Sequence, residues 1–232
     1  MAHPRYVFII NPGSGSVTLA RIKLLHSTIT EHKLDAEVVL TGSDIVAQTA
    51  RLRDAGYKAV VAAGGDGTLR SVASSLAGTK TAFGVLPWGT FNHFARDLGV
   101  PNDLEAIFKA LESGQTRRVD VGEVNGSIFL NNAGLGFYPR FVTEREKIQP
   151  YIGKMLAAAI ASVKVLIHYQ TFSLNLTING EVTKVTSPLV FIGNNDYQID
   201  RLGLVARENV DKGELCVYTL NSDKRADLVK LA

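Results

Sequence analysis

Short, mostly apolar runs recur along the first half of the chain. They cover residues 6–10, 36–40, 58–63 and 82–86, and turn residues follow each of them. Runs of this length are typical of strands that are buried on both faces of a sheet. The pattern therefore predicts four strands in this half.

Between these runs, apolar residues recur at helical spacing. Leu69, Val72, Ala73 and Leu76 stand at positions i, i+3, i+4 and i+7, and a glycine follows them as a stop. Further helices are predicted over 17–33, over 44–54 with Ser43 as N-cap, from Thr90 onward, and over 104–111. Strands that alternate with helices predict an α/β fold with a mostly parallel sheet covered on both faces.

After residue 120 the turn chemistry changes to that of hairpins. Asn125-Gly126 joins runs at 119–124 and 127–131, and Asn179-Gly180 follows the alternating apolar residues of 172–178. Asn-Gly is the dipeptide that two-residue type I′ hairpins prefer. We therefore predict two domains, an α/β domain over 1–119 and an antiparallel β-rich domain over 120–232.

One helix, over about 151–168, is predicted to interrupt the β-rich region. Its broad apolar face would pack on the β domain, or it would face lipid with Lys147, Lys154 and Lys164 near phospholipid head groups. The sequence leaves both readings open.

Composition narrows the class of protein. Hydrophobic residues make up 46% and charged residues 20%, which is ordinary for a soluble globular protein, and no apolar stretch reaches the ~20 residues of a membrane span. The single cysteine, Cys216, stands in an apolar run and allows no internal disulfide, and no secretory leader pattern opens the chain, so we expect a cytoplasmic location. The net charge of +3 does not demand nucleic acid and does not rule out an anionic membrane surface.

The glycine-rich segment Gly64–Thr68 stands between the third predicted strand and its helix. Such a turn brings backbone N–H groups to a helix N-terminus, which suits a phosphate. Asp66 in its centre would repel a phosphate unless a cation lay between them, so Mg²⁺ is implied as well. The alternative is a plain strand-to-helix turn that needs positive φ.

Other polar residues follow neighbouring strands. Ligands of parallel sheets bind beyond the carboxyl ends of the strands, where Asn11, Thr41, Gly64–Thr68 and Gly89-Thr90 should converge. Each polar side chain also has a structural alternative, because Asn11 and Thr90 could cap helices and Thr41 could end a strand. The sequence has no P-loop motif and no protein-kinase motif, so a different phosphate-binding solution is needed.

Three motifs in order carry a family resemblance. Gly64–Thr68 matches the GGDGT signature shared by diacylglycerol-kinase-like lipid kinases and NAD kinases. Residues 7–15 resemble the strand and N-P-x-S-G turn that open the lipid kinases, and residues 84–101 resemble their P-x-G-T-x-N-D-F-A-R-x-L-G-I-P block. The chain is therefore identified as a member of the bacterial diacylglycerol-kinase-like lipid kinases, with NAD kinase as the alternative.

The resemblance implies a two-domain NAD kinase/diacylglycerol kinase-like fold and ATP-dependent transfer of the γ-phosphoryl group to a lipid hydroxyl. It implies Mg²⁺, and it implies peripheral attachment at the inner membrane surface, with no nucleic acid partner. It assigns metal binding and the catalytic role to Asp66. The nucleotide would be lined by Asn11, Thr41, Gly64, Gly65, Asp66, Gly67, Thr68, Gly89, Thr90 and Asn92. The acceptor lipid and a homodimer are left open.

Three departures from the family pattern change the expectation. His93 stands where the block has aspartate, and Lys212 occupies the second acidic place of a D-D-G-x-L segment that helps to hold a structural metal in some relatives. Either the Lys212 ammonium replaces that cation or Asp211 takes over its role. Relatives continue to a D-G-E segment with the expected general base, so we expect this chain to bind nucleotide and to transfer phosphate poorly, or to be a non-catalytic binding module.

Overall fold

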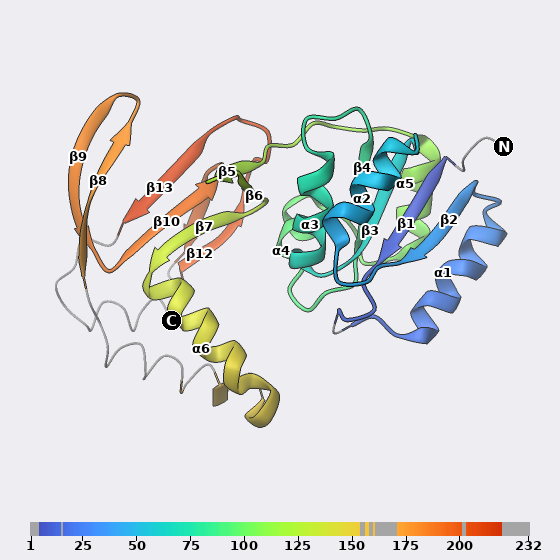
Figure 1. The fold of residues 1–232 in the computed structure, drawn as a ribbon, viewed down its shortest axis with the longest axis horizontal. Coiled ribbons are helices and arrows are strands. Elements are labelled where there is room, and N and C mark those ends of the chain that lie inside the picture. The colour runs from blue at the N-terminus through green and yellow to red at the C-terminus, as the bar shows by residue number, and fades with distance from the viewer. Residues whose placement is uncertain are drawn as a thin grey trace. The chain divides into compact units, whose positions relative to one another are not determined.

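The computed structural model describes residues 5–14, 16–153, 156–157, 160, 171–200 and 203–219. The chain forms two compact units, Met1–Asn131 and Asn132–Ala232, and each is described by itself. Figure 1 shows the elements of both units.

The first unit is built on a four-stranded parallel sheet. Its strands are β1 (Tyr6–Ile10), β2 (Ala36–Leu40), β3 (Ala59–Gly64) and β4 (Ala82–Pro87), in the order β2-β1-β3-β4. All four strands lie within one residue of their predicted ranges, because each strand is a compact apolar run.

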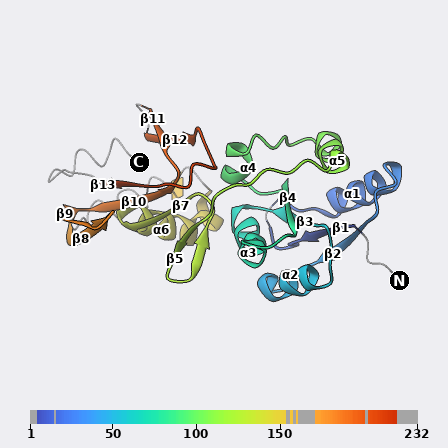
Figure 2. The same cartoon turned by 90° about the horizontal axis from the view of Figure 1, so that it is seen from above.

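Helices cover both faces of this sheet (Figure 2). They are α1 (Leu19–Glu31), α2 (Ile45–Asp54), α3 (Asp66–Leu76), α4 (His93–Asp97) and α5 (Leu104–Ser113). Alternate residues of β1 enter two separate cores: Val7 and Ile9 pack with α3, whereas Phe8 and Ile10 pack with α1 and α5. The α/β fold with a sheet buried on both faces is thus confirmed.

Four predicted helix starts differ from the structure, and one of them is α1, which begins at Leu19 and not at residue 17. Asp44, not Ser43, caps α2, since its side chain accepts the Ala47 N–H at 3.0 Å. The helix expected from Thr90 begins at His93, and α3 begins at Asp66, so Asp66, Gly67 and Thr68 form its first turn. The last difference brings the glycine-rich segment into the helix N-terminus itself.

Both predicted Asn-Gly hairpins are confirmed. Strands β5 (Gly122–Val124) and β6 (Ser127–Phe129) are joined at Asn125 and Gly126, where φ is 50° and 74°. The positive φ values are those that a type I′ turn requires. Because Leu130, just beyond β6, is buried in the core beneath α3, the hairpin belongs to the first unit, which ends after Asn131 and not at residue 119.

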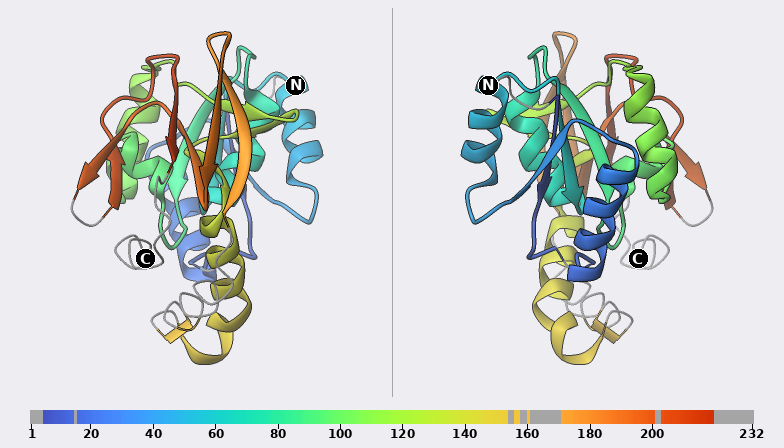
Figure 3. Two further views of the ribbon diagram at one scale, coloured as in Figure 1. Left: turned by 90° about the vertical axis from the view of Figure 1, so that its left-hand side faces the viewer. Right: turned by 90° about the vertical axis from the view of Figure 1, so that its right-hand side faces the viewer.

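The second unit is antiparallel, as predicted. Strands β7 (Asn132–Gly136), β10 (Leu189–Asn194) and β13 (Leu215–Thr219) form one sheet in the order β13-β10-β7. Strands β8 (Phe172–Ile178) and β9 (Glu181–Ser187) form a separate hairpin, the two-stranded orange ribbon of Figure 3, and β11 (Tyr197–Asp200) pairs with β12 (Gly203–Arg207). Cys216, in its apolar run, lies in β13.

One helix of this unit, α6 (Phe137–Ile152), was not predicted. Of the helix expected over 151–168, only residues 151–153, 156–157 and 160 lie within the described ranges, and all but Gly153 are helical. Lys147 pairs with Glu144 at 2.7 Å, while Lys154 and Lys164 lie outside the described residues. Among the helices that the structure describes, none combines the length and the apolar character needed to cross a bilayer.

A histidine joins two helices of the first unit. His32, at the end of α1, places Nε2 3.0 Å from Glu105 Oε2 and Nδ1 2.7 Å from Glu112 Oε1, both on α5. Only the doubly protonated ring can donate to both carboxylates. The hydrogen bonds to Glu112 and Glu105 therefore raise the pKa of His32 above its usual 6.5.

We expect this contact to make stability depend on pH. A raised folded-state pKa means that the contribution is fully present below the unfolded value of 6.5 and is lost as the pH rises through the folded-state pKa. The His32 contribution to the melting temperature of the wild type should therefore fall as the pH rises above about 6.5, and His32→Gln should remove this fall. His26→Gln, an exposed change on the same helix, is the control and should leave the fall in place. An equal pH response in wild type and His32→Gln would contradict this expectation.

Candidate functional site

Three turns meet at the carboxyl ends of β1, β3 and β4. Asn11 Nδ2 donates to Thr68 Oγ1 at 3.1 Å, which joins the first turn to α3. Ser14 Oγ accepts the Gly65 N–H at 3.1 Å and donates to the Trp88 carbonyl at 3.4 Å, so it touches the other two turns. The convergence predicted from topology is therefore confirmed for the turns after β1, β3 and β4, and hydrogen bonds hold these turns together.

The glycines of these turns allow close backbone approach. A Cβ on Gly89 would lie 2.3 Å from the Gly65 Cα, and one on Gly64 would lie 2.7 Å from the Thr68 side chain. Gly65 has φ −89°, which any residue can adopt. Gly64 and Gly67 are likewise not among the glycines with positive φ, so the alternative reading of a turn that needs positive φ is wrong. Close packing explains Gly64 and Gly89.

The N-terminus of α3 carries free donors. Gly65 is the N-cap and makes no side-chain cap, and its carbonyl accepts the Leu69 N–H at 3.0 Å. Within the described part of the chain, the N–H groups of Asp66, Gly67 and Thr68 have no hydrogen-bond partner. Three such donors at the positive end of an 11-residue helix are suited by their geometry to bind an anion.

The Asp66 carboxylate connects two of the turns. Its Oδ2 accepts the His93 N–H at 3.2 Å and its Oδ1 accepts the Phe94 N–H at 3.1 Å. Asp66 therefore satisfies the first N–H groups of α4, which has no cap from its own N-cap residue. No group of three or more potential metal ligands of the His, Cys, Asp or Glu type occurs among the described residues. A cation at Asp66 would thus need most of its ligands from elsewhere.

The other expected site residues differ in what they contact. Asn92 uses its amide on the backbone of its own turn, with three hydrogen bonds of 2.9–3.0 Å. The exposed Thr90 precedes α4 without capping it, so that structural alternative is wrong. Thr41 follows β2 and is buried, and its N–H donates to the Ile10 carbonyl at 2.8 Å.

Two residues of the site were missed by the sequence analysis. Ser14 bridges the turns as described, and Ser16 Oγ donates to the Gly89 carbonyl at 3.4 Å. Arg21 Nη1 donates in turn to the Ser16 carbonyl at 3.1 Å, and its guanidinium lies 5.9 Å from the centre of the Trp88 ring. The serines on either side of Gly15 were the available signal, since short hydroxyl side chains commonly bond to nearby backbone.

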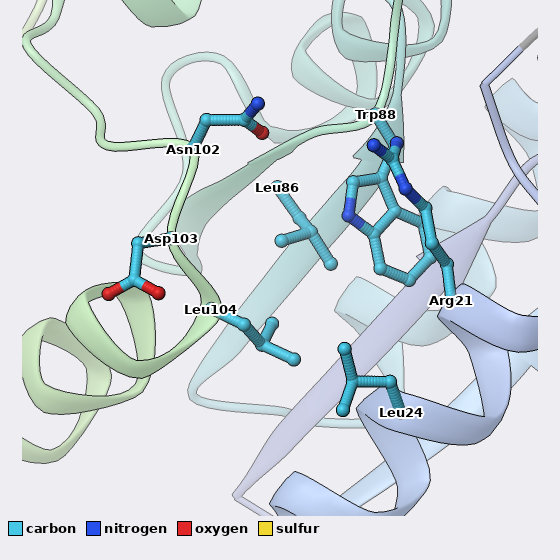
Figure 4. A pocket seen from close by; sticks show the side chains of 7 residues that line it. All are labelled: Arg21, Leu24, Leu86, Trp88, Asn102, Asp103 and Leu104. Atoms are coloured by element: carbon cyan, nitrogen blue, oxygen red, sulfur yellow. The ribbon is translucent and has the colours of Figure 1, made fainter.

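A small pocket lies behind the third turn, on the face of the sheet that α1 and α5 cover (Figure 4). Its volume is 240 Å³, and it is lined by Arg21, Leu24, Leu86, Trp88, Asn102, Asp103 and Leu104. The Asp103 side chain caps α5 through the Ala106 N–H at 3.0 Å. The pocket is smaller than the ~300–1,000 Å³ of typical ligand sites.

His93 takes the place of a family aspartate. Its Nδ1 lies 3.1 Å from Arg96 Nη2, and its ring stacks on Phe91 with centroids 5.5 Å apart. An arginine can only donate, so Nδ1 is the acceptor in this pair. The departure thus exchanges a carboxylate for an imidazole that is bonded to Arg96.

The second unit supports neither expectation for the D-D-G-x-L segment, namely that the Lys212 ammonium replaces a structural metal or that Asp211 helps to hold one. The Lys212 and Asp211 side chains are both exposed. The Lys212 backbone N–H donates to Oδ1 of the fully buried Asn195 at 3.1 Å. A hydrogen bond from the Lys212 backbone to the buried asparagine therefore holds this loop, and neither side chain occupies a buried metal position.

The profile of the diacylglycerol kinase catalytic domain matches residues 5–124, which is more than half of the chain. The chain belongs to the diacylglycerol-kinase-like lipid kinase family. A probable lipid kinase YegS-like protein of Cronobacter sakazakii is 35% identical over 167 residues, which are 69% of this chain and 53% of that protein. A diacylglycerol kinase of Staphylococcus aureus is 27% identical over 227 residues, which are 95% of this chain and 71% of that protein. The chain thus spans about half the length of the first relative.

Solved structures agree on the fold of this lipid kinase family member. A putative diacylglycerol kinase from Bacillus anthracis has a TM-score of 0.74 at 23% identity and covers 98% of this chain and 79% of its own. Another diacylglycerol kinase structure from that organism has a TM-score of 0.71 at 23% identity, with 97% and 76% covered. The NAD kinase alternative is not favoured, because the matched profile and the relatives are lipid kinases.

Proposed function

We propose that this chain binds ATP with Mg²⁺ at the three turns and serves the transfer of the γ-phosphoryl group to a lipid hydroxyl. One observation carries the proposal: the N–H groups of Asp66, Gly67 and Thr68 lack partners in the described residues, and the family profile covers them. Backbone donors at a helix N-terminus suit phosphate oxygens.

The chemistry required of the protein is positioning and charge stabilisation. In phosphoryl transfer, charge spreads over the transferred group, and preorganised donors stabilise it without reorganising. The three N–H groups and the α3 dipole supply such donors in place of a P-loop lysine. Asn11 has one amide hydrogen left beside its bond to Thr68, so it can donate to a nucleotide. The exposed Thr90 hydroxyl and the Thr41 hydroxyl complete the proposed nucleotide contacts, together with Gly64, Gly65 and Gly89 as backbone.

The oxygen ligands at Asp66 fit a Mg²⁺ ion that takes most of its other ligands from the nucleotide and from water. Each carboxylate oxygen accepts one N–H and keeps a lone pair. Mg²⁺ is commonly held by one or two carboxylates together with substrate phosphates and waters, and not by an all-protein cage. Bound in this way, the ion would neutralise phosphate charge, and Asp66 would orient it.

The acceptor class follows from the relatives' names. One is called a lipid kinase and another a diacylglycerol kinase, so we propose a diacylglycerol-like lipid presented at a membrane surface. A cytoplasmic, peripheral location would give the protein access to ATP and to such a lipid.

Calorimetry with ATP tests the proposal. We expect micromolar to millimolar binding that requires Mg²⁺, in the range of common enzyme KM values of about 1 μM–1 mM. Radiolabelled ATP should then be offered with diacylglycerol, a sphingoid base or phosphatidylglycerol in mixed micelles, and NAD serves as the non-lipid control. Absence of nucleotide binding with and without Mg²⁺ would sink the proposal, and labelling of NAD alone would replace the acceptor class.

A further inference from the structure

The turn after β4 is shaped by one side chain. Asn92 Oδ1 accepts the Gly89 N–H at 2.9 Å, and Asn92 Nδ2 donates to the carbonyls of Pro87 and Gly89, both at 3.0 Å. Both amide hydrogens are therefore used inside the turn. The backbone of Asn92 is left-handed, with φ 51° and ψ 43°, a conformation that asparagine tolerates better than most residues.

This turn brings the backbone of Gly89 into close contact with Gly65, in the glycine-rich segment Gly64–Thr68. The two glycines approach so closely that a Cβ on Gly89 would lie 2.3 Å from the Gly65 Cα and 2.6 Å from Asn92 Oδ1. Gly65 is the N-cap of α3 and directly precedes the three free N–H groups. The position of Gly89 therefore limits where Gly65 and the start of α3 can lie.

We propose that Asn92 is a positioning residue, which acts through Gly89 and Gly65 on the N–H groups of Asp66, Gly67 and Thr68 and does not itself contact the nucleotide. The proposal rests on the proposed function for the anion that these groups bind. It replaces the direct nucleotide contact that the sequence suggested for Asn92. Since both hydrogens of the Asn92 amide already bond to backbone carbonyls of the same turn, the side chain has no N–H left for a ligand.

The turn contains a fluorescent residue, Trp88, that can report on its packing. Trp88 is the single tryptophan of the chain, is only 6% exposed, and its carbonyl accepts the Ser14 hydroxyl. Loosening of the turn should expose the Trp88 ring. Quenching of its fluorescence by acrylamide therefore measures the turn in the absence of any nucleotide.

The test uses Asn92→Gly, since glycine adopts the left-handed backbone at no cost and removes only the amide. Asn125→Gly is the matched control: Asn125 has φ 50° and has no side-chain hydrogen bond among the described residues. We expect Asn92→Gly to raise the acrylamide quenching constant of Trp88. It should also lower the affinity for ATP, ADP and pyrophosphate by a common factor of about ten, which corresponds to about one net hydrogen bond. Asn125→Gly should change neither quantity.

A double mutant adds a second criterion. Gly89→Ala should push the backbones of Gly89 and Gly65 apart, because the added Cβ would meet the Gly65 Cα. The double mutant Asn92→Gly/Gly89→Ala should therefore lose less ATP affinity than the product of the two single effects. Fully multiplicative effects, unchanged quenching in Asn92→Gly with weakened ATP, or unchanged ATP affinity in Asn92→Gly would each overturn the proposal. If the wild type binds no nucleotide, the proposed function fails, and the quenching result alone still decides whether Asn92 holds the turn.

Discussion

Replacing Gly65 by valine should abolish nucleotide binding in a protein that still folds. The Cβ of a residue at this position would lie 3.4 Å from the Gly89 Cα and 3.7 Å from Ser14 Oγ, so a single carbon is accommodated. The two methyl groups of valine must then enter either the contact with Gly89 or the space before the α3 N–H groups. We expect ATP affinity to fall at least a hundredfold, about 2.7 kcal/mol, by calorimetry.

Gly65→Ala is the matched variant for this prediction. Its one added carbon fits at ordinary van der Waals distance, and φ −89° suits alanine. Its ATP affinity should therefore stay within about tenfold of the wild type. Equal ATP affinity in the wild type and a folded valine variant would show that the phosphates lie elsewhere.

Changing Asp66 to asparagine should impair both the site and the fold. An amide places an N–H₂ group against the N–H of His93 or Phe94, whichever way it is turned, so one cap hydrogen bond of α4 is lost. The lost cap should cost about 1 kcal/mol, which lowers the melting temperature by about 2–4 °C in a protein of this size. The lost charge should remove Mg²⁺-dependent ATP binding, with a loss of a hundredfold or more.

Asp103→Asn separates these two effects. Asp103 caps α5 through the Ala106 N–H at 3.0 Å, so this control changes a cap carboxylate away from the three turns. We expect nucleotide binding to be unchanged in Asp103→Asn, measured by calorimetry beside a thermal melt. Normal Mg²⁺-dependent ATP binding by Asp66→Asn would leave Asp66 with the capping role alone.

Local patterns predicted the elements well for a physical reason. The four parallel strands are continuous apolar runs, and both Asn-Gly hairpins carry the residues that positive φ favours. Helix starts were less accurate, since the N-cap is set by which side chain reaches a free N–H. Asp44 and not Ser43 does so at α2. The helix α6 carries prolines at positions 139 and 150 and was not foreseen.

The sequence by itself determined where the candidate site lies and which family the chain resembles. Parallel strands bring Asn11, Gly64–Thr68 and Gly89 to one edge of the sheet, whatever the details of packing. The GGDGT segment, placed between a strand and a helix, already indicated a helix N-terminus with room for an anion.

Only the tertiary structure decided which polar atoms remain available there. Asp66 bonds to the backbone of residues 93 and 94, Ser14 bonds to Gly65, and Asn92 bonds within its turn. The partners of Asp66 and Ser14 are far from them in sequence and cannot be deduced from spacing, because a polar side chain bonds to whichever backbone group the fold brings within reach. Among the described residues, tertiary packing thus leaves the N–H groups of residues 66–68 without partners. The bonds of Asn92 within its own turn fit the supporting role proposed above.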